Sequence, residues 1–291
     1  MPEKTPYHEN QLRDYSSLFS RGMVQDWLKG VLTSIAFKIE RYDSNRFKSG
    51  KQTYLDYLKY VYALMETHYR TEYILKNEFL NHQLIKEVKT TDAQVFSEFR
   101  VGNAIADLAL FNGHSTAFEI KTELDSDRRL FGQIENYKKV FNRIFLIVPA
   151  SKLSLYEKTD RSTGLIVFHF DKDRNKHFEV HRKADVCWDI EPETMMASLH
   201  TNEYKAIVNK HFGVVMGLTA FNQYERCLGL IRQIPVQTFN TLFIEQIKER
   251  NQRVTLTTRY FKEFNQLSLA LKMSKNEHKR LIQVLKTPIK A

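Results

Sequence analysis

One short stretch, residues 98–121, constrains the fold of this chain more than any other part of the sequence. It reads Glu-Phe-Arg-Val-Gly-Asn-Ala-Ile-Ala-Asp-Leu-Ala-Leu-Phe-Asn-Gly-His-Ser-Thr-Ala-Phe-Glu-Ile-Lys. Gly102-Asn103 and Asn112-Gly113-His114 are turn signals, and the residues around them are rich in strand formers. The segment therefore predicts a meander of three strands, at 95–101, 104–111 and 116–121.

The lengths of the two turns decide how these strands pair. A two-residue turn at Gly102-Asn103 places Glu98 opposite Asp107. A three-residue turn at 112–114 places Asp107 opposite Glu119, whereas a two-residue turn would send Glu119 to the other face. Burial favours the three-residue turn, because it gathers four apolar side chains on the opposite face, namely Leu108, Leu110, Phe118 and Ile120.

In that register Glu98, Asp107, Glu119 and Lys121 share one face. Acids on neighbouring strands repel one another unless a positive charge lies among them. A divalent cation fits, because Mg²⁺ prefers carboxylate, water and phosphate oxygens, and Mn²⁺ accepts the same ligands. Lys121 would steer or help to deprotonate a water, or stabilise the charge that develops on phosphorus. The pattern predicts metal-dependent hydrolysis of a phosphodiester bond.

The rest of the chain predicts helices around a mixed sheet. Residues 10–87 have apolar side chains at helical spacing, and the sequence beyond residue 185 is helical again. Between them we expect a helix capped by Asp125 or Ser126, a buried strand at 144–148, and a hairpin of strands 165–170 and 177–181. The predicted fold class is α/β, with a central mixed sheet flanked by helices and with helical regions at both ends.

Composition and charge narrow the setting. A hydrophobic fraction of 42% indicates a globular protein, and no apolar run reaches the ~20 residues that span a bilayer. No secretory signal is evident, and Cys187 and Cys227 make neither a disulfide framework nor a zinc site, so we expect a cytoplasmic protein without membrane contact. Of the formal net charge of +10, residues 201–291 supply +9, from 15 basic and 6 acidic residues. This excess suits a polyanion such as nucleic acid, or else marks solvated helix faces.

Two motifs resemble a known group of enzymes. Asp107 followed by Glu119-Ile120-Lys121 is similar to the signature of the PD-(D/E)XK nuclease superfamily, although Ala106 stands where a proline often precedes the first acid. Gln133 and Tyr137 match the Gln-x-x-x-Tyr motif of its RecB-like branch. The run 119–125, Glu-Ile-Lys-Thr-Glu-Leu-Asp, also resembles a bacterial family within that superfamily.

The resemblance implies a restriction-endonuclease-like core and assigns roles within it. Asp107 and Glu119 would be metal ligands, and Lys121 the catalytic lysine. A further acid often comes from the first helix of the core, so that Glu72 and Glu98 compete for this place, and Glu72 is equally well explained as a surface acid. Gln133 would reach a phosphate or a metal-bound water, and Tyr137 would contribute mostly to packing.

Three regions and three functions are predicted. The regions are an N-terminal helical region at 1–68, the nuclease-like core at 69–185 and a basic C-terminal helical region at 186–291. The leading function is an Mg²⁺- or Mn²⁺-dependent deoxyribonuclease, which the resemblance associates with phage defence or DNA repair. The alternatives are a catalytically silent DNA-binding or assembly subunit and an RNA-cleaving effector. A protein partner or a homo-oligomer stays open, as does the choice between exonuclease and endonuclease.

Overall fold

The computed structural model describes residues 6–48, 50–171, 175–250, 256–257 and 261–290. The chain forms two compact units, and the second is inserted into the first. The first unit combines Met1–Ile85 with Gln252–Ala291, and the second is the continuous stretch Lys86–Asn251. The predicted regions 1–68, 69–185 and 186–291 have other boundaries than these units and stay a prediction from sequence.

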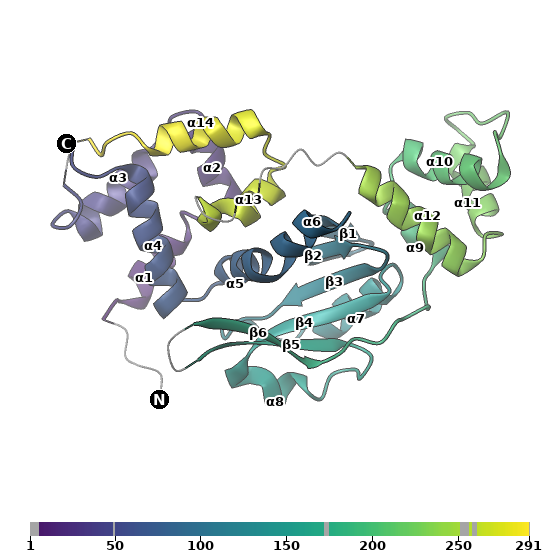
Figure 1. The fold of residues 1–291 in the computed structure, drawn as a ribbon, viewed down its shortest axis with the longest axis horizontal. Helices are drawn as coiled ribbons and strands as arrows, with labels where there is room; N and C mark the ends of the chain where they lie inside the picture. Colours follow the sequence, from purple (N-terminus) through teal and green to yellow (C-terminus); the bar gives the residue numbers. More distant parts are fainter. Residues whose placement is uncertain (1–5, 49, 172–174, 251–255, 258–260, 291) are drawn as a thin grey trace. The chain divides into compact units, whose positions relative to one another are not determined.

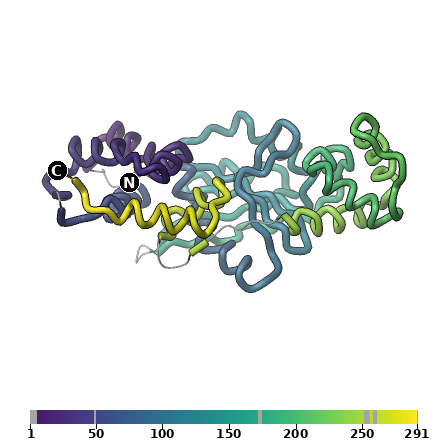
Figure 2. Tube along the Cα trace, turned by 90° about the horizontal axis from the view of Figure 1, so that it is seen from above, coloured from purple at the N-terminus to yellow at the C-terminus, as the bar shows by residue number. Residues whose placement is uncertain are grey.

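The first unit is helical, and both ends of the chain build its core. Helix α14 packs against α2 and α4, and Figure 2 shows this C-terminal helix beside the N-terminal ones. Trp27, Tyr57, Phe264 and Leu281 belong to the same buried cluster. The N-terminal helices are α1 (Glu9–Ser16), α2 (Arg21–Leu28), α3 (Thr33–Lys38), the π-helical η1 (Ile39–Asp43), α4 (Tyr54–His68), α5 (Glu72–Phe79) and the π-helical η2 (Leu80–Leu84); the C-terminal ones are η4 (Lys262–Phe264), α13 (Asn265–Ala270) and α14 (Lys275–Leu285).

The second unit is built on a six-stranded mixed sheet, which confirms the predicted α/β class (Figure 1). The strands lie in the order β1 to β6; β3–β4 and β4–β5 pair in parallel, and the other neighbours are antiparallel. Parallel neighbours are usually covered on both faces, and the central strand β4 is almost wholly apolar. The strands are β1 (Gln94–Val101), β2 (Ala104–Phe111), β3 (Ser115–Ile120), β4 (Arg143–Pro149), β5 (Gly164–Phe170) and β6 (Lys176–Arg182).

Helices on one face of this sheet form a continuous core with it. Ala109, Phe111 and Ala117 of the meander lie in one cluster with Ile134 of α7 and Phe243 of α12. The helices of this unit are α6 (Ile85–Thr90), α7 (Leu130–Lys138), η3 (Ala150–Lys152), α8 (Leu153–Tyr156), α9 (Pro192–Ala197), α10 (Thr201–Phe212), α11 (Gln223–Ile231) and α12 (Val236–Glu249).

Both predicted turns of the meander are confirmed. Val101 pairs with Ala104 across a two-residue turn, and Phe111 pairs with Ser115 across the three-residue turn. Gly102 and Gly113 have φ angles of 54° and 99°, which glycine adopts at little cost. No helix in the described ranges has both the length and the hydropathy to cross a membrane.

The helix that follows the meander begins later than predicted. It starts at Leu130, with Arg129 as its N-cap, and not at Asp125 or Ser126. Asp125 is engaged elsewhere, because its carboxylate accepts a hydrogen bond of 2.8 Å from the Thr122 amide and its carbonyl accepts one from Lys152 Nζ. These bonds hold an ordered loop between the third strand and α7.

Candidate active site

The candidate site lies at the C-terminal end of β3. Glu119 is the penultimate residue of β3 and pairs with Leu146 of β4. The Lys121 amide still donates a 2.9 Å hydrogen bond to the Ile147 carbonyl, so the chain stays in the sheet for one residue more. Because both side chains are held by a paired backbone, Glu119 and Lys121 project from a rigid element.

Glu119 and Lys121 form a buried ion pair that Gln133 of α7 completes. Lys121 Nζ lies 2.8 Å from Glu119 Oε1 and donates a second hydrogen bond, of 3.2 Å, to Gln133 Oε1. Gln133 Nε2 donates in turn to Glu119 Oε1 over 2.6 Å. Glu119 and Lys121 are only 3% and 8% exposed. A charge that is buried to this extent needs a partner, and here the charged and polar groups of the three side chains are hydrogen-bonded to one another.

Tyr137 holds the other oxygen of Glu119. Its hydroxyl lies 2.7 Å from Glu119 Oε2 and 2.7 Å from the Ile105 carbonyl, so one proton serves two acceptors. Burial, followed by the charge of Glu119 and its hydrogen bond, raises the pKa of Tyr137 far above its usual range. Tyr137 therefore remains a neutral donor that orients the carboxylate, and the expectation that it mostly packs was incomplete.

Asp107 lies on the same side of the sheet as Glu119. One Asp107 carboxylate oxygen accepts a 2.8 Å hydrogen bond from the Ile120 amide, directly beside Glu119. The charge of Asp107 also contributes to the raised pKa of Tyr137, which places it within electrostatic reach of that hydroxyl. The β2–β3 ladder ends at Leu108–Phe118, one residue before the predicted pair, because the Asp107 side chain takes the next amide.

Glu98 lies at an irregular position of β1, opposite Asp107. The β1–β2 ladder keeps one register on both sides of Glu98 and Asp107 but omits that pair. Glu98 has a left-handed φ of 57° and is exposed. Phe96 and Phe99 both lie in the cluster under α7, so the strand reverses its in–out alternation at Glu98. β2 changes its alternation at the same place, because Ala106 and Ala109 both lie in that cluster. Glu98 therefore stays opposite Asp107 in the predicted register, and its role as a ligand stays a prediction.

Glu72 belongs to the first unit. It lies in the first turn of α5, and its carboxylate accepts a 2.8 Å hydrogen bond from Lys76 Nζ, with half of the Glu72 side chain exposed. Within the residues that the structure describes, no three acidic, histidine or cysteine side chains come together as a metal site. Within the second unit the structure thus brings together Asp107, Glu119, Lys121 and Gln133.

Comparison with known proteins places this chain in a family. A profile of the family described as Bacteriophage P4 protein cII matches residues 65–281, which include both strands and the helix of the site. This chain belongs to the bacteriophage P4 protein cII family. Protein cII of Enterobacteria phage P4 is 27% identical over 172 residues, which are 57% of this chain and 63% of the phage protein. The match therefore spans less than two thirds of that relative.

Among solved structures, one protein of unknown function from Silicibacter pomeroyi is similar to part of this member of the cII family. The two are 15% identical, and the similarity covers 49% of this chain and 91% of the other. The TM-score is 0.30, which is too low to carry an argument about fold or function.

The carboxylates of Asp107 and Glu119 have the chemistry of metal ligands, and they are two in number. Mg²⁺ commonly uses one or two carboxylates and completes its shell with water and substrate phosphate. Glu119 Oε1 already accepts two hydrogen bonds, whereas Oε2 accepts one from Tyr137 and keeps a lone pair. Asp107 and the Oε2 atom of Glu119 are therefore the groups that would hold the ion.

Proposed function

We propose that this protein is a metal-dependent nuclease that hydrolyses phosphodiester bonds, with DNA as its substrate. One observation carries the proposal: Glu119, Lys121 and Gln133 form a single buried network, and Asp107 is fixed beside it through the Ile120 amide. A sheet surface that served only packing would not need a buried acid–lysine pair. The proposal is strengthened by the resemblance of these residues to the PD-(D/E)XK signature.

The residues divide the chemistry among them. A bound Mg²⁺ or Mn²⁺ would lower the pKa of a water and offset the charge of the phosphate. Asp107 and Glu119 would hold the ion, while Lys121 Nζ would donate to the oxygen on which negative charge grows. Gln133 and Tyr137 are positioning residues, since each donates to a different oxygen of Glu119. Water adds to phosphorus as the bond to the 3′ oxygen breaks, which leaves a 5′ phosphate and a 3′ hydroxyl.

The test compares cleavage with binding. Asp107→Asn and Lys121→Met should each lower cleavage of plasmid, linear duplex and single strands by about 10²- to 10³-fold, the range typical for the loss of one electrostatic stabiliser. Binding of the same substrates in EDTA should change little. Asp127→Asn, an exposed acid in the loop before α7, is the matched control. Unaltered cleavage by both site variants would disprove the proposed site.

A silent DNA-binding or assembly subunit is the second candidate. It is favoured by the absence of a three-acid cluster in the described part of the chain and by the lysine that already pairs with Glu119. Calorimetric titration with Mg²⁺ separates the two functions, because a nuclease should bind the ion at millimolar concentration and lose this binding in Asp107→Asn. Matched DNA and RNA substrates test the third candidate, an RNA-cleaving effector. A role in phage defence or DNA repair stays part of the proposal.

A further inference from the structure

The positive charge after residue 201 falls into two parts that the structure uses differently. One part lies on α10–α12 of the second unit, and the other lies on and around α14 of the first unit. From sequence alone they form a single basic region. In the structure the two parts differ in how many of their cations form ion pairs.

The cations of α10–α12 are largely engaged within their own unit. Four ion pairs link this region to nearby acids: Lys210–Glu245 at 2.7 Å, Arg232–Glu193 at 2.7 Å, Lys248–Asp92 at 2.5 Å and Arg250–Glu203 at 2.7 Å. Arg226 donates to the carbonyls of Met216 and Gly217. These side chains therefore hold helices together and offer little uncompensated charge to a ligand.

The cations of α14 are not engaged in this way. Lys275, Lys279, Arg280 and Lys286 are all exposed, and none forms an ion pair with any residue that the structure describes. Lys275, Lys279 and Lys286 lie within about 40° of one another around the helix axis. Like charges four residues apart destabilise a helix by a few tenths of a kcal/mol. A helix that carries such a stripe gains from a bound polyanion.

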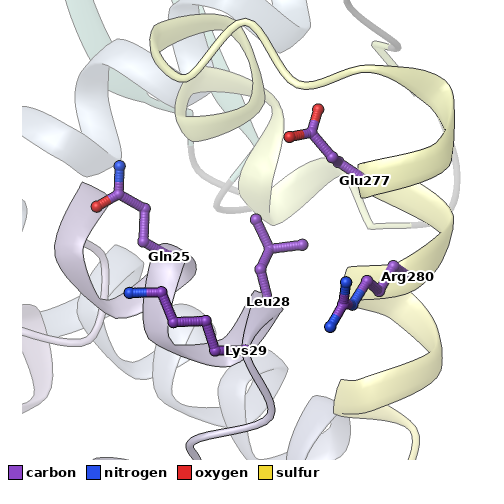
Figure 3. A pocket seen from close by; sticks show the side chains of 5 residues that line it. All are labelled: Gln25, Leu28, Lys29, Glu277 and Arg280. Carbon is purple, nitrogen blue, oxygen red and sulfur yellow. The ribbon is translucent and has the colours of Figure 1, made fainter.

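A groove beside α14 brings Lys29 near Arg280, on the flank of the exposed side that lies about 100° or more around the axis from the lysines. It has a volume of about 490 Å³ and is lined by Gln25, Leu28 and Lys29 of the α2 end and by Glu277 and Arg280 of α14. In Figure 3, Glu277 and Arg280 project from α14 toward α2. Glu277 accepts hydrogen bonds from the amide and hydroxyl of Ser274 and forms no ion pair with Arg280 in the described part of the chain.

We propose that the exposed side of α14, with the Lys29–Arg280 groove, binds the phosphate backbone of a nucleic acid strand. The surface would recognise the charge and spacing of the phosphate groups, so the contact is independent of base sequence. The inference rests on the proposed function only in taking nucleic acid as the polyanion. It assigns the binding to α14 and not to α10–α12, whose cations are mostly paired.

The test measures the affinity of the full chain for a fluorescein-labelled oligonucleotide, by anisotropy, across a series of KCl concentrations in EDTA. Without metal no cleavage occurs, so the result does not depend on whether the protein is a nuclease. Each phosphate contact contributes about 0.9 to the salt slope on duplex and about 0.7 on a single strand. The triple variant Lys275→Gln, Lys279→Gln, Lys286→Gln should therefore lower the slope on duplex by about 2 to 3.

The control is a triple variant with the same change in net charge, Lys210→Gln, Arg232→Gln and Lys248→Gln, whose cations are paired in the folded protein. It should leave the slope nearly unchanged. An equal fall in both triples would show a general charge effect and overturn the assignment to α14. An unchanged salt slope in the α14 triple variant would also overturn it. The same holds if inorganic phosphate displaces the labelled oligonucleotide as effectively, per phosphate group, as the unlabelled strand does.

Discussion

The candidate active site and the exposed side of α14 are both rich in charge, yet they hold it in opposite ways. In the site, Lys121 and Glu119 are buried and each is tied to a partner. On α14, Lys275 and Lys279 are exposed, and no described residue forms an ion pair with them. Burial makes an unpaired charge costly, whereas water screens an exposed one. Substitutions should therefore act strongly and cooperatively in the site, but weakly and additively on α14.

The largest expected effect is that of Glu119→Ala. It leaves the Lys121 ammonium buried without its carboxylate, which should lower the free energy of unfolding by about 3–5 kcal/mol in urea titrations. The double variant Glu119→Leu, Lys121→Met removes both charges and should recover most of that stability while cleavage stays absent. If the double variant is as unstable as the single one, the cost comes from packing and not from charge.

Tyr137→Phe should have an intermediate effect. The lost hydroxyl serves a carboxylate, so we expect a loss of about 1.5–3 kcal/mol in unfolding free energy. Cleavage should fall as well, because Glu119 Oε2 loses the donor that orients it. Tyr156→Phe is the matched control: this tyrosine is equally buried, and its hydroxyl has no hydrogen-bond partner among the described residues. Equal losses in the two variants would remove the orienting role from Tyr137.

A smaller effect should be the pH dependence of stability that comes from His278, on the buried side of α14. Burial lowers the pKa of His278, which is only 4% exposed. Below the unfolded pKa of about 6.5 the unfolded chain binds the proton more readily than the folded one, so stability falls as pH drops from there toward the folded pKa. Each unit of lowering corresponds to about 1.4 kcal/mol. Thermal melts of His278→Gln should show a flatter pH dependence than the parent; an unchanged profile would contradict this.

The smallest effect should also have the opposite sign. Lys279→Gln removes a like-charge pair with Lys275 at i, i+4, so it should stabilise α14 by about 0.2–0.5 kcal/mol. The same change should weaken binding of nucleic acid and reduce the salt slope on duplex by about 0.9. A gain in stability with a loss in binding, measured on one variant, would sharpen the contrast with the site. A loss of stability would show that Lys279 has a structural partner.

Local signals in the sequence were sufficient to predict the three-stranded meander. The turn residues Gly102-Asn103 and 112–114 fix the register, and the apolar face opposite Asp107 and Glu119 follows from it. Spacing alone also brings Gln133 and Tyr137 to one face of α7. The sequence therefore predicted the residues that meet in the site, although their role as a metal centre stays a prediction.

Other features depend on contacts that no local pattern encodes. The left-handed Glu98 reverses the alternation of its strand, and a glutamate carries no signal for that conformation. Asp125 has the chemistry of a helix cap, but the Thr122 amide competes for its carboxylate. Likewise, composition could not separate the paired cations of α10–α12 from those of α14, because pairing depends on which acids the fold brings near.

The insertion of one unit into the other has a consequence for synthesis on the ribosome. The sheet unit is continuous, so it can condense as soon as residue 251 has left the exit tunnel. The N-terminal helices, made first, must wait for Phe264 and Leu281 before their cluster is complete. A nascent chain thus exposes the apolar surface of these helices until α13 and α14 have been made, and any truncation that removes α13 and α14 would leave that surface open to chaperones and proteases.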